Sequence, residues 1–313
     1  MQQASNRQPP VAAAAIIGFG EVGPIFAAAL TAQGVRVAAY DVKLGDAATR
    51  GQIEERARRS GAHIAQSLQA AVEGADLVFS AVTASQAEPV ARDAARFLRA
   101  GQTLIDLNSV SPKVKQRNSE AVQRGGAAYV ESAVMAPVPP QGVKVPMLLG
   151  GETAEAVCAT LNALGMKTQA VAREVGLASA IKLCRSIMIK GMEALCVQSM
   201  LAARAFGVDE RVLASLHASF PSVGWDKGYE AYLIGRVIEH GQRRSEEMRE
   251  AAAMLGDLGM DTGLAEVIAD VQANLARVGR DEALLEDIDG KGALPEWRAL
   301  LGGKSAGPEA AAS

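Results

Sequence analysis

The stretch that decides the fold runs from Val11 to Asp41 and reads VAAAAIIGFGEVGPIFAAALTAQGVRVAAYD. An apolar run leads into the motif GFGEVG over residues 18–23, an alanine-rich amphipathic segment follows, and a second apolar run ends on Asp41. This order predicts a strand, a tight Gly-x-Gly-x-x-Gly turn, a helix and a second strand. We therefore expect a βαβ unit whose glycine turn faces a dinucleotide, and a plain βα turn is the alternative.

Each glycine of the motif has a mechanical role. Gly18 allows the tight turn, Gly20 lets the backbone approach a pyrophosphate, and Gly23 lets the helix pack closely on the strand. The N–H groups at the start of the following helix would face the phosphates. Asp41 stands where a carboxylate accepts hydrogen bonds from the adenosine ribose, and it would repel the 2′-phosphate of NADP. NAD is therefore favoured, while Lys43 and Arg50 nearby could soften the repulsion and leave NADP possible.

We expect the nicotinamide cofactor to contact the glycine turn, the acid after the second strand, and the ends of two later strands. The expected cofactor-binding residues are Gly18, Phe19, Gly20, Glu21, Val22, Gly23, Asp41, Val82, Thr83 and Asn108.

Length and composition limit the class of protein. The chain has 313 residues, which is enough for two domains with their own cores. Its formal net charge is −3, so we expect no nucleic-acid partner. No apolar run approaches the length of a membrane span, so we expect no membrane partner. The three cysteines lack a Cys-x-x-Cys spacing, which favours a reduced, cytoplasmic setting. The three histidines are scattered, so we expect no metal site.

The pattern of elements changes once along the chain. Up to about residue 174, apolar strands alternate with helices, which predicts a doubly wound, mostly parallel Rossmann-type α/β sheet. After Gly176, helical periodicity predicts one long helix over 177–206 and further helices over 209–216, 228–240, 243–256 and 261–278. The predicted organisation is a flexible leader (1–10), an NAD(P)-binding Rossmann domain (11–174), an all-α substrate and dimerisation domain (175–301) and a disordered tail (302–313). We expect a homodimer, because the apolar faces of the long helix need partners.

Lys182 is the strongest candidate for proton transfer. Oxidation of an alcohol needs a base for the hydroxyl proton. Lys182 lies among apolar residues of the predicted long helix, and Ser186 and Lys190 follow it at i+4 and i+8 on the same face. The alternative is a lysine that snorkels from a helix surface.

Four segments in chain order resemble the β-hydroxyacid dehydrogenase family, which includes 3-hydroxyisobutyrate and 6-phosphogluconate dehydrogenases. GLASAIK over 176–182 is similar to its Gly-x-x-x-x-x-Lys catalytic motif, and GFGEVG fits its N-terminal fingerprint. DLNSVSP over 106–112 resembles its Asp-x-Ser-Thr-x-x-Pro loop, and residues 131–151 occupy the place of its substrate segment. The resemblance covers roughly residues 12–260. It implies a dehydrogenase in which Lys182 is the general acid or base and Ser186 assists it.

The chain departs from the family at two places. Met135-Ala136-Pro137 replaces a Ser-Gly-Gly that holds the substrate carboxylate, and Ser186 replaces an asparagine. These variant motifs resemble a subgroup whose helical C-terminal domain is uncharacterised. The retained lysine argues against the related imine reductases.

We therefore expect other residues than those of the family to contact the substrate. Arg243 or Arg244 could bind a carboxylate or phosphate bidentately, and surface pairing with Glu246, Glu247 or Glu250 is the alternative. The expected substrate-binding residues are Ser109, Met135, Ala136, Pro137, Lys190, Arg243 and Arg244.

We therefore hypothesise that the protein is an NAD(P)-dependent oxidoreductase that acts on the alcohol or carbonyl of a small, hydroxy-acid-like substrate. Oxidative decarboxylation of a 3-hydroxy acid, and a non-catalytic NAD-binding sensor or scaffold, are the alternatives.

Overall fold

The computed structural model describes residues 11–278. The chain divides into two compact units between Lys182 and Leu183, inside one long helix. The predicted leader over 1–10, the end of the predicted helical domain over 279–301 and the predicted tail over 302–313 lie outside the described residues.

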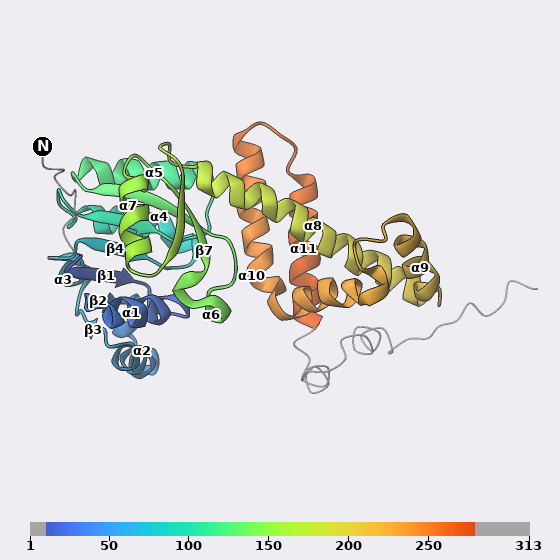
Figure 1. Ribbon diagram of the computed structural model, residues 1–313, viewed down its shortest axis with the longest axis horizontal. Coiled ribbons are helices and arrows are strands. Elements are labelled where there is room, and N and C mark those ends of the chain that lie inside the picture. The colour runs from blue at the N-terminus through green and yellow to red at the C-terminus, as the bar shows by residue number, and fades with distance from the viewer. Residues whose placement is uncertain (1–10, 279–313) are drawn as a thin grey trace, which may run out of the picture. The chain divides into compact units, whose positions relative to one another are not determined.

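The N-terminal unit is built on one eight-stranded sheet (Figure 1). Its strand order is β3-β2-β1-β4-β5-β6-β7-β8, and only the β6–β7 pair is antiparallel. The doubly wound, mostly parallel sheet predicted from the sequence is therefore confirmed. The strands are β1 (Ala13–Ile17), β2 (Arg36–Tyr40), β3 (His63–Ile64), β4 (Leu77–Ser80), β5 (Thr103–Asp106), β6 (Ala128–Val134), β7 (Pro146–Gly150) and β8 (Lys167–Ala172).

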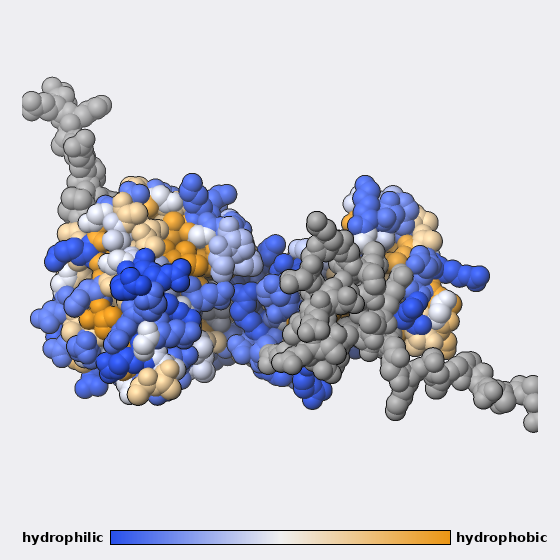
Figure 2. All heavy atoms as spheres, turned by 90° about the horizontal axis from the view of Figure 1, so that it is seen from below, coloured by the Kyte–Doolittle hydropathy of each residue, from blue (hydrophilic) through white to orange (hydrophobic). Residues whose placement is uncertain are grey.

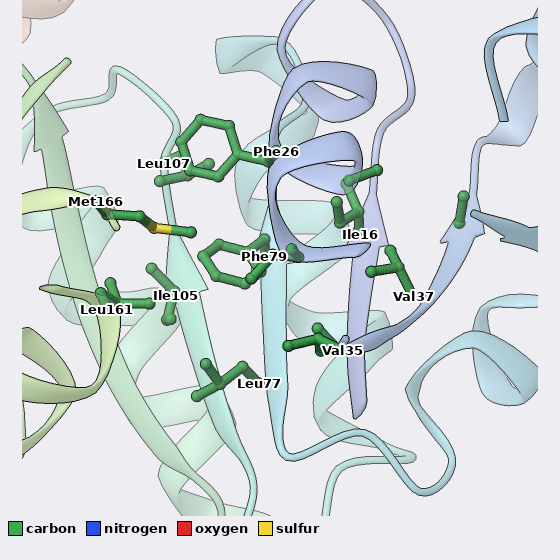
Figure 3. Packing of buried hydrophobic residues seen from close by; sticks show 14 of the residues in the cluster. Ile16, Phe26, Val35, Val37, Leu77, Phe79, Ile105, Leu107, Leu161 and Met166 are labelled. Atoms are coloured by element: carbon green, nitrogen blue, oxygen red, sulfur yellow. The ribbon is translucent and has the colours of Figure 1, made fainter. Parts of the chain in front are cut away.

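The central strands are buried on both faces, because helices cover the sheet. Alternate side chains of the same strands enter two separate apolar clusters, Ile16 and Phe79 on one face and Ile17 and Val78 on the other. Figure 3 shows the first cluster, where the ring centroids of Phe26 and Phe79 lie 5.8 Å apart. The helices of this unit are α1 (Val22–Ala32), α2 (Ala47–Ser60), α3 (Leu68–Val72), α4 (Ala84–Ala95), α5 (Pro112–Arg124), α6 (Val138–Gln141) and α7 (Ala154–Ala163).

The C-terminal unit, as far as residue 278, is helical. The long helix predicted over 177–206 is confirmed as α8 (Leu177–Ala205), which begins in the N-terminal unit. The others are α9 (Asp209–Ser219), α10 (Tyr229–Asp257) and α11 (Gly263–Val278). No helix within 11–278 is both long enough and apolar enough to span a bilayer. On the face shown in Figure 2, hydrophilic residues predominate and apolar patches lie between them.

The predicted break between two helices at 240–243 is wrong, because residues 229–257 form the single helix α10. Gly241 lies between the two predicted helices, and its role is tertiary. A Cβ at this position would lie 2.3 Å from the carbonyl oxygen of Gln272 on α11. Glycine here permits close contact between two helices. The two-residue strand β3 was also not predicted, since two residues are too few to show a periodicity.

Candidate functional site

The candidate cofactor site lies at the carboxyl edge of the sheet. The order of strands reverses between β1 and β4, and ligands of doubly wound sheets bind outside the carboxyl ends of the strands at such a point. The glycine turn follows β1, Asp41 follows β2, and Val82 and Thr83 follow β4. The fold thus brings these sequence-predicted residues to one edge of the sheet.

The three glycines of the turn differ in what requires them. Gly18 has a φ of 90°, and a Cβ on it would lie 2.4 Å from the carbonyl oxygen of Ala81. A Cβ on Gly23 would lie 2.5 Å from the carbonyl oxygen of Gly18. A Cβ on Gly20, by contrast, would meet no atom within 4 Å. Packing within the chain explains the first two glycines, whereas no contact among the described residues requires the third, and its role in the close approach of a ligand stays a prediction.

The helix that follows is suited to an anion. The N-cap residue of α1, Glu21, makes no side-chain hydrogen bond to the first turn. The N–H groups of that turn and the positive end of the helix dipole therefore suit a pyrophosphate.

Asp41 is fixed against the glycine turn. Its Oδ2 accepts a hydrogen bond from the N–H of Phe19 at 2.7 Å, and its Oδ1 accepts one from the N–H of Lys43 at 2.9 Å. Each carboxylate oxygen has a further lone pair that a ribose hydroxyl could use. Arg56 on α2 donates to the carbonyl oxygen of Phe19 at 3.3 Å. Sequence reasoning did not identify this contact, because nothing local indicates which arginine of a cluster faces inward.

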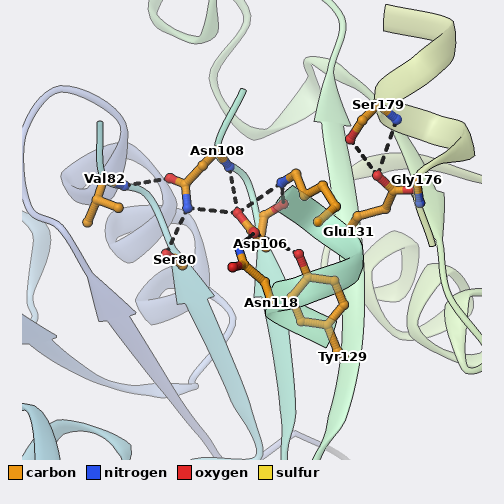
Figure 4. Close-up of polar contacts among 10 residues, drawn as sticks. Ser80, Val82, Asp106, Asn108, Asn118, Tyr129, Glu131, Gly176 and Ser179 are labelled. Atoms are coloured by element: carbon orange, nitrogen blue, oxygen red, sulfur yellow. Dashed lines mark hydrogen bonds and ion pairs between the residues drawn. The ribbon is translucent and has the colours of Figure 1, made fainter. Parts of the chain in front are cut away.

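A buried polar network lies beneath the loops that follow β4 and β5 (Figure 4). At its centre is Asp106, the last residue of β5, which is 1% exposed. Its Oδ1 lies 2.9 Å from Nζ of the buried Lys115, and its Oδ2 accepts hydrogen bonds from the Tyr129 hydroxyl at 2.7 Å and the Asn118 amide at 3.2 Å. Burial and then the Asp106 carboxylate raise the pKa of Tyr129 well above its ordinary value, so the phenol remains a neutral donor.

The network determines the orientation of Asn108. The side-chain nitrogen of Asn108 donates to Asp106 Oδ1 at 2.7 Å and to Ser80 Oγ at 2.9 Å. Its oxygen therefore faces the N–H of Val82, which donates to it at 2.7 Å (Figure 4). The Asn108 side chain shapes the loop after β4. Its own contact with a cofactor stays a prediction.

The predicted substrate segment follows β6 directly. Met135, Ala136 and Pro137 are half-buried, and the N–H of Met135 donates to the carbonyl oxygen of Pro146 at 2.9 Å. Ser109 Oγ is buried and has no hydrogen-bond partner among the described atoms. A buried hydroxyl without a partner fits a group that contacts a ligand.

The predicted residues on α8 fall on both sides of the division between the units. Lys182 is half-buried and is the last residue of the N-terminal unit. In the C-terminal unit, Lys190 Nζ donates to Ser186 Oγ at 3.0 Å and lies 2.8 Å from Oε2 of Glu247. Burial lowers the pKa of Lys190, and the charge of Glu247 opposes that shift.

The two predicted arginines of α10 have different surroundings. Arg244 is buried, and its Nε donates to Glu193 on α8 at 2.9 Å. Gln272 on α11 donates to the same carboxylate at 3.0 Å. Arg243 is exposed. The structure thus brings Ser186, Lys190 and Arg244 into one buried polar cluster and leaves Arg243 outside it, and substrate contact by any of them stays a prediction.

The described residues show no arrangement for a metal. No three His, Cys, Asp or Glu side chains within 11–278 gather as ligands. Cys158, Cys184 and Cys196 are free thiols.

Comparison with known proteins agrees with this geometry. Residues 13–170 match the family described as the NAD binding domain of 6-phosphogluconate dehydrogenase, and residues 203–275 match a domain of unknown function (DUF1932). The chain is 34% identical to a conserved hypothetical protein from Sinorhizobium meliloti 1021, over 96% of this chain and 98% of that one, with a TM-score of 0.78.

Two further solved structures are similar. A conserved protein of unknown function, whose structure is described as similar to 3-hydroxyacid dehydrogenases, is 29% identical over 85% of this chain and 98% of its own, with a TM-score of 0.69. The 3-hydroxyisobutyrate dehydrogenase of Mycobacterium tuberculosis, solved with L-serine, has a TM-score of 0.72 at 15% identity, over 90% of this chain and 100% of its own, which shows the fold alone. The chain therefore belongs to the family that carries the NAD binding domain of 6-phosphogluconate dehydrogenase, here joined to a C-terminal domain of unknown function, with structural neighbours of the 3-hydroxyisobutyrate dehydrogenase type.

Proposed function

We propose that the protein is an NAD(P)-dependent oxidoreductase that transfers hydride between the nicotinamide and the alcohol or carbonyl carbon of a small, hydroxy-acid-like substrate. The observation that carries the proposal is the glycine turn at the point where the strand order reverses. Gly20 is open to a ligand, while Gly18 and Gly23 are required by packing. When bound there, the nicotinamide supplies the hydride acceptor or donor.

In this proposal Lys182 holds and moves the proton. Its ε-amino group takes the hydroxyl proton of the substrate during oxidation and returns it to the carbonyl oxygen during reduction. Ser186, one helical turn further along α8, assists by hydrogen bonding. This assignment rests on the motif over 176–182 and on its place directly after the NAD binding domain.

Asp41 supports NAD in preference to NADP. The carboxylate is held beside the glycine turn by the N–H groups of Phe19 and Lys43. A 2′-hydroxyl could donate to it, whereas a 2′-phosphate would be repelled.

The substrate is proposed to be small and polar. Ser109 has a buried hydroxyl without a partner among the described atoms, and Met135 to Pro137 form a half-buried segment at the end of β6. Lys190 and Arg244 would offer positive charge, once a carboxylate of the substrate replaces one of their present acidic partners.

We also propose a homodimer in which α8 contributes to the interface. Met188, Met192 and Leu195 follow one another at i, i+4 and i+7, and their exposed fractions are 66%, 36% and 69%. Apolar side chains at this spacing form one face of a helix that a second copy can cover. Met188→Glu should shift the sedimentation coefficient toward that of a monomer, and an unchanged value would count against this interface.

The test of the function is cofactor binding and turnover by the purified full-length protein. NADH and NADPH binding is measured by fluorescence, and turnover is measured with a panel of 3-hydroxy acids, sugar acids and L-serine. Lys182→Met is compared with Lys167→Met, which makes the same change at an exposed position of β8.

We expect NADH to bind all three proteins, and turnover to be lost only in Lys182→Met. Turnover that Lys182→Met leaves unchanged would refute the role of Lys182. Tight binding without turnover on any substrate would favour the non-catalytic sensor, and release of carbon dioxide would identify oxidative decarboxylation.

A further inference from the structure

Glu131 is a buried carboxylate with no part in the proposed chemistry. It lies on β6 and is 0% exposed. Its Oε1 accepts hydrogen bonds from the N–H groups of Gly176 at 2.5 Å and Ala178 at 3.1 Å. Its Oε2 accepts hydrogen bonds from both the N–H and the hydroxyl of Ser179, at 3.2 Å and 2.5 Å (Figure 4). One side chain of the sheet thus holds the first turn of α8 through four donors.

The surrounding chain is shaped to admit this carboxylate. Gly150 on β7 is the register partner of Glu131, and a Cβ on it would lie 2.5 Å from Glu131 Oε1. Gly176 turns into α8 with a φ of 111°, which places its N–H on the same oxygen. Glycine is therefore needed at both positions for Glu131 to reach the helix.

The physical reason for placing an acid here is the start of the helix. The first N–H groups of a helix have no partners within it, and the helix dipole is positive at this end. A carboxylate that accepts several N–H bonds satisfies these donors. A buried carboxylate without such donors is unfavourable. The hydrogen bonds to Glu131 should therefore hold the start of α8 in one position.

The first turn of α8 leads directly to Lys182, which is three residues after Ser179. Three residues are nearly one helical turn, so the position of Lys182 follows from that of the anchored turn. The strand that carries Glu131, β6, leads into Met135 and the rest of the predicted substrate segment. Glu131 therefore connects the helix that carries the lysine to the strand that carries this segment.

We infer that Glu131 is a positioning residue that fixes Lys182 relative to the carboxyl edge of the sheet. This inference rests on the proposed function, in which Lys182 moves the proton. Glu131 touches neither substrate nor cofactor in this role, and it acts only through the start of α8.

Three variants of the full-length protein test the inference. Glu131→Gln keeps the shape but presents an NH₂ group to backbone donors. Ser179→Ala is milder, since it removes the hydroxyl and leaves three N–H bonds. Ser132→Ala is the matched control, because Ser132 is the next residue of β6, is 1% exposed, and its Oγ has no partner among the described atoms.

Hydrogen exchange at residues 176–183, the dissociation constant of NADH, and kcat on the best hydroxy acid of the panel are measured for each variant. We expect Glu131→Gln to exchange at least about tenfold faster at these amides. We also expect its kcat to fall by about 100-fold, since a misplacement of about 1 Å can have that effect. NADH affinity should stay within about twofold, since the glycine turn does not contact Glu131. A tenfold loss of affinity would correspond to about 1.4 kcal/mol. Ser179→Ala should be intermediate and Ser132→Ala unchanged.

Unchanged exchange in Glu131→Gln, or faster exchange with full kcat, would overturn the inference. Equal losses of NADH affinity and kcat would also overturn it, because they indicate general unfolding. Lys182→Met separates the two claims. If that variant keeps its turnover, the proposed function fails; if it is inactive while Glu131→Gln keeps full kcat, only the role of Glu131 fails.

Discussion

Replacement of Lys115 by methionine should destabilise the N-terminal unit strongly. Lys115 is 0% exposed, and its Nζ lies 2.9 Å from both Oδ1 and the carbonyl oxygen of Asp106. Methionine has a similar length but no charge, so the variant leaves a buried carboxylate without this cation. Removing one partner of a buried ion pair costs about 3–5 kcal/mol of unfolding free energy.

The loss should be visible in thermal and chemical unfolding. For a domain of this size, 1 kcal/mol shifts Tm by about 2–4 °C, so we expect Tm to fall by about 6–20 °C. Urea unfolding followed by far-ultraviolet circular dichroism gives the free energy, and hydrogen exchange at the amides of β5 assigns the change to this unit.

The control is Lys113→Met, which makes the same change on the same helix at an exposed position. Its effect should stay within about 0.5 kcal/mol. Asp106→Asn added to Lys115→Met should restore part of the stability, because the uncompensated charge is then absent. Equal stability of the Lys115→Met and Lys113→Met proteins would refute the reasoning.

Four other changes have distinct expected results. Gly20→Ala should leave Tm unchanged, because its Cβ enters open space, but the pyrophosphate would occupy that space. NADH binding, measured by fluorescence, should therefore weaken by about tenfold or more, that is about 1.4 kcal/mol. Unchanged affinity would contradict this site. Gly241→Ala should cost about 1–3 kcal/mol in urea unfolding, because its Cβ would lie 2.3 Å from a carbonyl oxygen of α11. Gly235→Ala in the same helix meets no atom within 4 Å and should instead stabilise by about 0.5–1 kcal/mol. Burial lowers the pKa of His240, so the unfolded chain takes up its proton first, and stability should fall as pH drops from about 7 through the folded pKa. His240→Gln should reduce that fall, and an unaltered pH dependence would disprove it.

The predicted elements show which signals are local. The βαβ unit around residues 18–23 was predicted because the glycine spacing, the apolar runs and the amphipathic pattern of the helix are properties of neighbouring residues. The helix over Leu177–Ala205 was predicted because its interior contains one glycine and no proline. The break at Gly241 was wrongly predicted for the complementary reason. The residue that requires glycine there is Gln272, which is far away in the sequence.

The candidate site divides in the same way. Asp41 and the glycine turn were found from spacing alone, since both belong to one βαβ unit. Arg56 and Glu131 were not found, because each acts on a backbone that is distant in the sequence. Asn108 was predicted to bind the cofactor, but only the structure shows that Asp106 and Ser80 orient its amide.

The sequence by itself determined the order of elements, the mostly parallel sheet, the glycine turn with its acid, and the helix that carries Lys182. Local conformational preference and periodicity over a few turns fix these features. The tertiary structure alone decided which buried charges face one another, such as Lys115 with Asp106 and Arg244 with Glu193. It also decided that Glu131 holds the start of α8, because a buried polar group takes whichever partner the packing of distant segments brings within hydrogen-bond distance.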